Sequence, residues 1–198
     1  MKNIYNSALL HNNTKIIEGL PPTNRFELDG CIGLRRNIIT EGYYSELDSC
    51  DIIYCEPPFP TGIKVFDERA KEKTDYTDFC IKFALMWGEI KDKPKLAITN
   101  KRLLKYLPKP DMQISVILNK NLETLSCWGV ELPNYRMSNL KWCEYLGQTY
   151  TRMGDITCGY GVPVLSFKKS RRGNTFVASD YDAHCITGLR MLMNENIS

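Results

Sequence analysis

A glycine-containing loop between two short apolar segments is the feature that most constrains the fold of this chain. Residues 149–155 are a strand candidate, residues 161–170 a short helix and residues 175–179 a second strand. The sequence GDITCGYG joins the first strand to the helix, and Gly159 and Gly161 let the backbone turn sharply and approach a ligand closely. Because ligands of parallel α/β sheets bind beyond the carboxyl ends of the strands, this loop predicts a binding site.

An acidic residue ends the second of these strands. Asp180 lies nineteen residues after Gly161, and a carboxylate at this spacing can accept hydrogen bonds from both hydroxyl groups of a ribose. Position 164 is Val164, so the full dinucleotide fingerprint G-x-G-x-x-G is absent, which disfavours a dehydrogenase. The pattern predicts a nucleoside site. The alternative is a plain strand–helix–strand turn in which Asp180 caps the following helix.

The remaining apolar segments predict an α/β protein. Strands that alternate with helices indicate a mostly parallel sheet with helices on both faces, and residues 113–119 and 124–130 add an antiparallel edge hairpin. Further strands are expected at 37–40, 51–55 and 95–99, and helices at 75–89, 138–146 and 182–194, with Ser138 and Asp182 as N-caps. Residues 1–35 are expected to be less regular, and residues 60–75 to form an exposed loop.

The composition fits one globular domain. Of the 198 residues 43% are hydrophobic, which suffices for a sizeable core, so residues 1–198 are expected to fold as a single domain. No apolar run reaches the length of a membrane span and the N-terminus lacks the apolar centre of a signal peptide, so we expect a cytoplasmic protein. The eight cysteines form no C-x-x-C pair, and we therefore expect buried, reduced thiols and no metal site.

A second motif follows the apolar segment DIIYC. The residues Glu56-Pro57-Pro58-Phe59 form a rigid, extended exit from the predicted strand, because two prolines fix the backbone and donate no hydrogen bonds. A carboxylate and a proline carbonyl can accept the two hydrogens of an exocyclic amino group, and an aromatic ring can stack on a planar base. The EPPF segment therefore predicts a pocket for a nucleobase.

These two motifs carry a family resemblance. DIIYCEPPF resembles motif IV of the amino-methyltransferases, usually (D/N/S)-P-P-(Y/F/W), and GDITCGYG resembles their motif I, commonly DPFxGxG. FVASDYDAHCITGLRML is similar to the segment that follows motif I, and residues 138–146 fall where the family places a cofactor-contacting helix. Motif IV before motif I is the permuted order of the β-class DNA adenine-N6 or cytosine-N4 enzymes. The resemblance covers residues 36–194.

The resemblance implies a Rossmann-like methyltransferase sheet, S-adenosylmethionine as cofactor and methyl transfer to an exocyclic amino group. Adenine N6 in DNA is the leading acceptor, and no separate target-recognition domain is expected. The cofactor would be held by Asp155, Thr157, Gly159, Gly161 and Asp180, with Glu41 near its adenine, and the target base by the catalytic segment Glu56, Pro57, Pro58 and Phe59.

The chain departs from the family pattern at three positions. Glu56 replaces the usual Asp of motif IV, Thr157 replaces the usual Phe of motif I, and Tyr160 stands where a small residue is common. Three alternatives therefore stay open: an inactive relative that binds nucleic acid or a partner methyltransferase subunit, an RNA or protein-amide methyltransferase, and an enzyme that uses the cofactor for other chemistry. A homodimer is also expected, because the chain is short.

Other conspicuous residues carry less information. A net charge of +3 is compatible with a nucleic-acid partner without indicating one. Of three groups of basic residues, the first two are equally well explained as phosphate contacts or as solvated surface, and the third, beside the EPPF segment, is slightly better placed to contact a nucleic-acid backbone. The tryptophans are predicted to be core residues rather than base-stacking groups. The basic groups are Lys101, Arg102 and Lys105; Lys168, Lys169, Arg171 and Arg172; and Lys64, Arg69, Lys71 and Lys73; the tryptophans are Trp87, Trp128 and Trp142.

Overall fold

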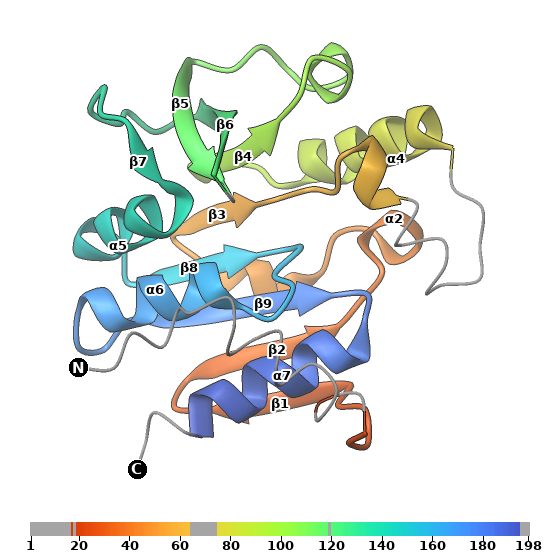
Figure 1. Ribbon diagram of the computed structural model, residues 1–198, viewed down its shortest axis with the longest axis vertical. Helices are drawn as coiled ribbons and strands as arrows, with labels where there is room; N and C mark the ends of the chain where they lie inside the picture. Colours follow the sequence, from red (N-terminus) through yellow and green to blue (C-terminus); the bar gives the residue numbers. More distant parts are fainter. Residues whose placement is uncertain (1–16, 18, 64–74, 119, 195–198) are drawn as a thin grey trace.

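One mixed β-sheet organises the chain (Figure 1). The computed structural model describes residues 17, 19–63, 75–118 and 120–194. Within them the strand order is β1-β2-β9-β8-β3-β4-β6-β5-β7. The strands are β1 (Arg25–Leu28), β2 (Cys31–Arg35), β3 (Ile52–Cys55), β4 (Lys95–Thr99), β5 (Met112–Leu118), β6 (Asn121–Trp128), β7 (Met137–Ser138), β8 (Arg152–Asp155) and β9 (Thr175–Asp180).

The centre of the sheet is parallel. Strands β2, β9, β8, β3 and β4 are paired in that order, each parallel to the next, whereas β6 runs antiparallel to both β4 and β5. The expected mostly parallel sheet with an antiparallel hairpin is thereby confirmed, and the two-residue strand β7 lies outside the hairpin. The pairing of Tyr54 with Asp155 brings the ends of β3 and β8 side by side.

The helices pack against the sheet through two clusters of buried hydrophobic residues. Ile52 and Tyr54 of β3 belong to a cluster with residues of α5, α6 and α7, whereas Ile53 and Cys55 belong to one with residues of α2 and α4. Because successive strand residues point to opposite faces, the two clusters lie on opposite sides of the sheet. The elements are α2 (Ile38–Glu41), η1 (Ser45–Ser49), α4 (Tyr76–Glu89), η2 (Leu103–Lys105), α5 (Asn139–Thr149), α6 (Val162–Ser170) and α7 (Ala183–Asn194).

Polar side chains define where the long helices begin. Asp75 accepts hydrogen bonds from the backbone N–H groups of Thr77 and Asp78, and Ser138 accepts one from Lys141. Such bonds satisfy donors that the first helical turn leaves without a backbone partner. The predicted caps at Ser138 and Asp182 are confirmed, since Asp182 accepts from the N–H of His184.

Two predictions near the N-terminus are wrong. Residues 37–40 are not a strand: Ile38–Glu41 forms a helical turn, because the Asn37 side chain caps it and Glu41 accepts from the Asn37 N–H. This reciprocal capping outweighs the β-propensity of the sequence IIT. The strand beside β9 is instead β2, which forms a hairpin with β1 in a segment expected to be less regular. The hairpin turn is Asp29-Gly30, both with positive φ.

The tryptophans and cysteines lie in the interior, as the sequence predicted. Trp87, Trp128 and Trp142 are all buried, as expected for core residues, and all eight cysteines are buried without disulfide bonds. No helix in the described part of the chain is long and apolar enough to cross a membrane. Most of the predicted loop at 60–75 lies outside the described residues, although residues 60–63 are helical.

Candidate functional site

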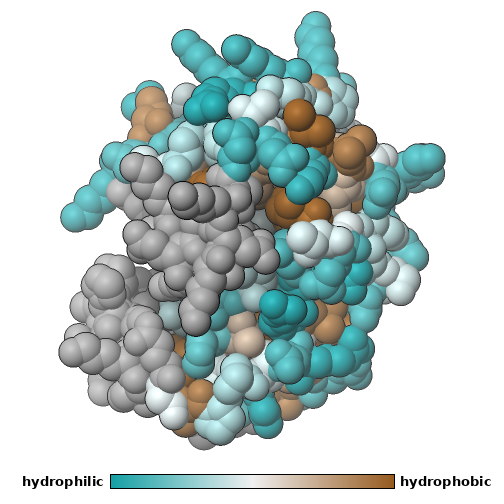
Figure 2. Space-filling view, turned by 90° about the vertical axis from the view of Figure 1, so that its right-hand side faces the viewer, coloured by the Kyte–Doolittle hydropathy of each residue, from teal (hydrophilic) through white to brown (hydrophobic). Residues whose placement is uncertain are grey.

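A cavity opens where β3, β8 and β9 end. Figure 2 views the molecule from the side toward which these strands point, and shows hydrophilic residues interspersed with a few hydrophobic ones. The residues from the predicted motifs that line the cavity are Glu56 and Pro58 after β3, Thr157 and Gly159 after β8, and Asp180 at the end of β9. Another part of its wall is apolar, with Ile38 and Ile39 of α2 and Phe79 of α4. Residues more than a hundred positions apart in the sequence therefore share one cavity.

The glycine loop is tied to the acidic end of β9. The backbone N–H of Gly159 donates to Asp180 Oδ2 at 2.8 Å, and the N–H of Asp182 donates to Asp180 Oδ1 at 3.0 Å. Gly159 has a φ of 51° and faces open space, because a Cβ placed there would meet no atom within 4 Å. The carboxylate of Asp180 thus orders the loop and also lines the cavity.

Gly161 packs against helix α7. Its φ is 75°, and a Cβ there would lie 2.4 Å from Cδ1 of Leu189 in α7. The described cavity does not include Gly161 in its lining. The positive φ and the close packing of α7 against the loop both require a glycine here, and its expected contact with a cofactor stays a prediction.

Asp155 lies beneath the loop rather than in the cavity lining. Its side chain is almost fully buried, and Oδ1 accepts a hydrogen bond from the N–H of Thr157 at 3.1 Å. Oδ2 is also buried, and no described residue donates a hydrogen bond to it. Burial raises the pKa of Asp155 well above its ordinary value, against the opposing effect of the Thr157 bond. A buried carboxylate oxygen without a donor is suited to receive a cationic group.

The Glu56 carboxylate is held by two neighbours. Its Oε1 accepts from the Tyr54 hydroxyl at 2.5 Å and from Asn139 Nδ2 at 2.6 Å, while its backbone N–H donates to Thr157 Oγ1 at 3.0 Å. Burial raises the pKa of Glu56, and the bonds from Tyr54 and Asn139 oppose that rise. The sequence provided no signal for Asn139, because its contact with Glu56 joins segments 83 positions apart.

The rest of the EPPF segment turns away from the cavity in part. Pro58 lines it, whereas Pro57 is buried and Phe59 packs against the core cluster that contains residues of α5, α6 and α7. The carbonyl of Phe59 accepts hydrogen bonds from the N–H groups of Gly62 and Ile63. Of the predicted base-holding residues, Glu56 and Pro58 therefore line the described cavity and Pro57 and Phe59 do not.

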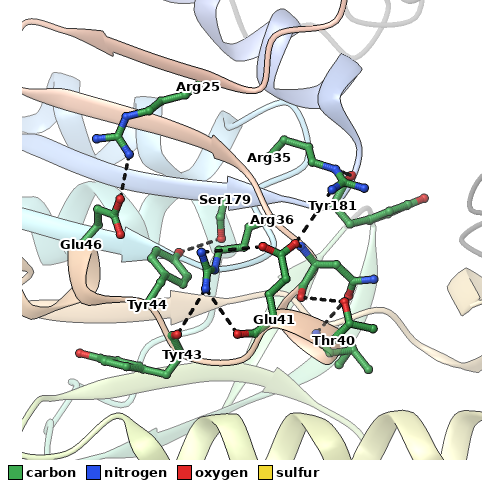
Figure 3. A network of polar contacts seen from close by, with 12 residues as sticks. Arg25, Arg35, Arg36, Thr40, Glu41, Tyr43, Tyr44, Glu46, Ser179 and Tyr181 are labelled. Atoms are coloured by element: carbon green, nitrogen blue, oxygen red, sulfur yellow. Dashed lines mark hydrogen bonds and ion pairs between the residues drawn. The ribbon is translucent and has the colours of Figure 1, made fainter.

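Glu41 is not among the residues that line the cavity. Figure 3 shows its carboxylate beside Arg35 and Arg36. Its carboxylate accepts from the Asn37 N–H at 2.8 Å and lies 3.8–4.0 Å from the guanidinium groups of Arg36 and Arg35. Arg36 also stacks on the ring of Tyr44, 4.9 Å from its centroid, and lines the cavity. Sequence reasoning missed Arg36, which directly precedes Asn37, the residue that caps α2.

Several residues of the predicted basic clusters contact other groups of the protein, first in the cluster of Lys168, Lys169, Arg171 and Arg172. Lys168 reaches the carbonyl of Asn174, and Arg171 donates to the carbonyls of Gln148 and Tyr150. Two members of that group therefore satisfy acceptors near the carboxyl ends of α5 and α6, where cations are favoured. Arg102 stacks on the ring of Tyr76. The group from Lys64 to Lys73 lies outside the described residues.

Comparisons with known proteins give only distant similarities. No family model and no curated protein sequence matches the chain. Among solved structures, the complex of M1.HpyAVI with SAM has a TM-score of 0.49 and 12% identity, over 79% of this chain and 94% of that one. TTHA0409 from Thermus thermophilus, described as a candidate DNA modification methylase and complexed with S-adenosyl-L-methionine, has a TM-score of 0.45 and 7% identity, over 92% and 90%. Similarities at this level do not decide the function.

Proposed function

We propose that this protein is an S-adenosylmethionine-dependent methyltransferase that modifies an exocyclic amino group of a nucleobase, with adenine N6 in DNA as the leading acceptor. The observation that carries the proposal is the shared cavity. Glu56 of the EPPF segment, Thr157 and Gly159 of the glycine loop, and Asp180 all line it. Two motifs that resemble the cofactor and target-base segments of amino-methyltransferases thus face one another across a single space.

The residues around the cavity fit the proposed cofactor. The cofactor carries an ammonium group, and Asp155 offers a buried carboxylate oxygen without a hydrogen-bond donor. It also carries a ribose, whose hydroxyl groups suit the carboxylate of Asp180. The apolar wall of Ile38, Ile39 and Phe79 is suited to the flat adenine ring. The ammonium group, the ribose and the adenine of the cofactor therefore each have a chemically matched group in or beneath the cavity.

The acceptor side relies on Glu56 and Pro57. When bound, the cofactor would supply a methyl group on a sulfonium: the nitrogen lone pair would form a bond to the methyl carbon as the C–S bond breaks, the neutral thioether would leave, and the methylated nitrogen would lose a proton to solvent. Glu56 and the carbonyl of Pro57 would accept the two amino hydrogens, which makes the nitrogen lone pair available for attack. The protein contributes mainly by orienting the two reactants and excluding water. A base in duplex DNA would first have to leave the stack, at a cost of a few kcal/mol.

Calorimetric titration with S-adenosylmethionine tests the cofactor half of this proposal. We expect the wild-type protein to bind the cofactor, and Asp180→Ala to weaken the binding strongly. Asp180→Ala also removes the bond to the Gly159 N–H, so its circular dichroism and thermal unfolding should be measured alongside. If the folded wild-type protein did not bind the cofactor, the proposed methyltransferase function would be refuted.

Transfer of a labelled methyl group tests the acceptor half. Unmethylated duplex DNA, single-stranded DNA, RNA and protein should be offered in parallel, and the product nucleoside identified by mass spectrometry. We expect N6-methyladenine in DNA, and its loss in Glu56→Ala. Label in RNA or protein would point to another acceptor on the same scaffold. Cofactor binding without any transfer would favour the inactive relative.

A further inference from the structure

Two donors converge on the same oxygen of Glu56. Oε1 accepts from the hydroxyl of Tyr54 at 2.5 Å and from Nδ2 of Asn139 at 2.6 Å. Tyr54 is a fully buried residue of β3, and Asn139 is the first residue of α5. Oε2 accepts no hydrogen bond from the part of the chain that the structure describes. One carboxylate oxygen is thus occupied by the protein and the other is available to a ligand.

We propose that Tyr54 and Asn139 are positioning residues that fix Oε1 of Glu56, so that Oε2 alone is presented to the amino group of the acceptor. The inference rests on the proposed function of the cavity. A glutamate has one more rotatable bond than an aspartate, and an unrestrained carboxylate would sample several positions. Two bonds to Oε1 remove that freedom, and a displacement of about 1 Å can cost on the order of 100-fold in rate.

The backbone of Glu56 is fixed as well. Its N–H donates to Thr157 Oγ1 at 3.0 Å, and the same hydroxyl lies 3.1 Å from Sγ of Cys55. Thr157 belongs to the glycine loop, so the residue expected to hold the target base is attached to the loop expected to hold the cofactor. Glu56 is therefore held at its backbone from the loop that follows β8 and at its carboxylate from β3 and α5.

The position of Asn139 is defined by its surroundings. The preceding residue, Ser138, caps α5 by accepting from the Lys141 N–H, and in β7 it pairs with Ile117 of β5. A helix that begins at a fixed point delivers the Asn139 side chain to a fixed point. The contact with Glu56 is thus built from elements that the fold holds independently of any ligand.

The electrostatics of the site make this arrangement testable by pH. Among the described residues, the ionisable groups that interact with Glu56 are Tyr54 and Cys55 of β3, Asp155 of β8 and Cys143 of α5, and none of these four is a cation. Burial raises the pKa of Glu56, and the bonds from Tyr54 and Asn139 are the interactions that lower it. Removing either donor is therefore expected to move the titration of Glu56 to higher pH.

The test compares Tyr54→Phe and Asn139→Leu with the wild-type protein. Each removes the donor and nearly preserves the shape of the side chain. The control is Glu144→Gln, an exposed position on α5. Three measurements are made: the carboxyl titration of Glu56 by NMR of protein with ¹³C-labelled glutamate, the Kd for S-adenosylmethionine by calorimetry, and kcat and KM for methyl transfer as functions of pH.

We expect the titration of Glu56 and the acidic limb of the kcat profile to move to higher pH in both variants but not in the control. The Kd should stay within about twofold of wild type, and kcat should fall on the order of 100-fold at neutral pH. An unchanged Glu56 titration would overturn the proposal, as would a parallel loss of cofactor affinity. If the wild-type protein transfers no methyl group, the proposed function fails and the NMR titration alone decides whether the two donors fix the carboxylate.

Discussion

The ring of Tyr160 lies against Gly188: a Cβ on this glycine would come within 2.5 Å of Cδ1 of the tyrosine. Tyr160 stands between the two glycines of the cofactor loop, and Gly188 lies inside helix α7. The described cavity lining does not include the tyrosine. An aromatic residue in this loop therefore packs on a helix and leaves the cavity open, and the helix tolerates a glycine because the ring needs the space.

This contact predicts that Gly188→Ala destabilises the protein. Forcing a methyl group into a packed contact costs about 1–3 kcal/mol, whereas alanine gains roughly 1 kcal/mol over glycine in a helix interior. We expect a net loss of about 1 kcal/mol in the free energy of unfolding, measured by urea denaturation. The matched control is Gly88→Ala in α4, where a Cβ would meet no atom within 4 Å. That variant should gain about 0.5–1 kcal/mol. Equal shifts in the two variants would contradict the packing of Tyr160.

Gly161 and Gly173 offer a second matched pair. Both have positive φ, 75° and 92°, but only at Gly161 would a Cβ collide with Leu189, whereas at Gly173 it would meet nothing within 4 Å. The left-handed conformation costs an alanine about 1–2 kcal/mol, and overpacking adds about 1–3 kcal/mol. Gly161→Ala should therefore lower the free energy of unfolding by roughly 2–5 kcal/mol and Gly173→Ala by roughly 1–2 kcal/mol. Similar losses in chemical denaturation would show that α7 does not pack on the loop.

Most of the fold could be predicted because its signals are local. Apolar runs located β3, β4 and β9, the glycine loop that follows marked β8 despite its few apolar residues, and capping residues located the beginnings of α5 and α7. The failures lie where a local signal was ambiguous. Ile38–Glu41 has strand-like residues, yet Asn37 and Glu41 cap it as a helical turn. The β1–β2 hairpin had a signal in its Asp29-Gly30 turn, which sequence reasoning passed over.

Of the candidate site, the sequence could predict only the residues that follow the ends of neighbouring parallel strands. Glu56, Thr157 and Asp180 line one cavity because parallel neighbouring strands end at the same edge of the sheet. The sequence could not reveal that Gly161 serves the packing of α7, or that Asn139 reaches Glu56. Those relationships depend on how helices lie against the sheet, which side-chain packing decides over the whole domain.

The carboxylate of Asp155 should lower the stability of the protein near neutral pH while it strengthens cofactor binding. Its folded-state pKa is raised by burial, so the folded protein binds its proton more tightly than the unfolded chain. The contribution of Asp155 to stability is therefore largest below its ordinary pKa and is lost as pH rises through the raised value. An asparagine at position 155 does not ionise, so its unfolding free energy does not fall in this pH range, and its amide oxygen can still accept from the Thr157 N–H. The unfolding free energy of Asp155→Asn should therefore rise relative to that of wild type as pH increases toward neutrality.

The same substitution removes the negative charge proposed to meet the ammonium group of the cofactor. A hydrogen bond to a charged group is worth about 1.5–3 kcal/mol, so the Kd for S-adenosylmethionine should rise roughly 10–100-fold in Asp155→Asn. Thermal unfolding across pH and calorimetric titration check the two effects. A variant that binds the cofactor as tightly as wild type would remove Asp155 from the cofactor site.

Thr157 links the two halves of the site through its hydroxyl, so its removal should be felt at Glu56. Oγ1 accepts from the Glu56 N–H at 3.0 Å, and valine has the same shape as threonine but no acceptor. Thr157→Val leaves that backbone donor without its partner, which costs about 1–3 kcal/mol in unfolding free energy. Hydrogen exchange of the Glu56 amide should accelerate in the same variant. Thr157→Ser keeps the hydroxyl and should protect the amide as wild type does. If both variants exchanged alike, the hydroxyl would not be what fixes the EPPF segment to the glycine loop.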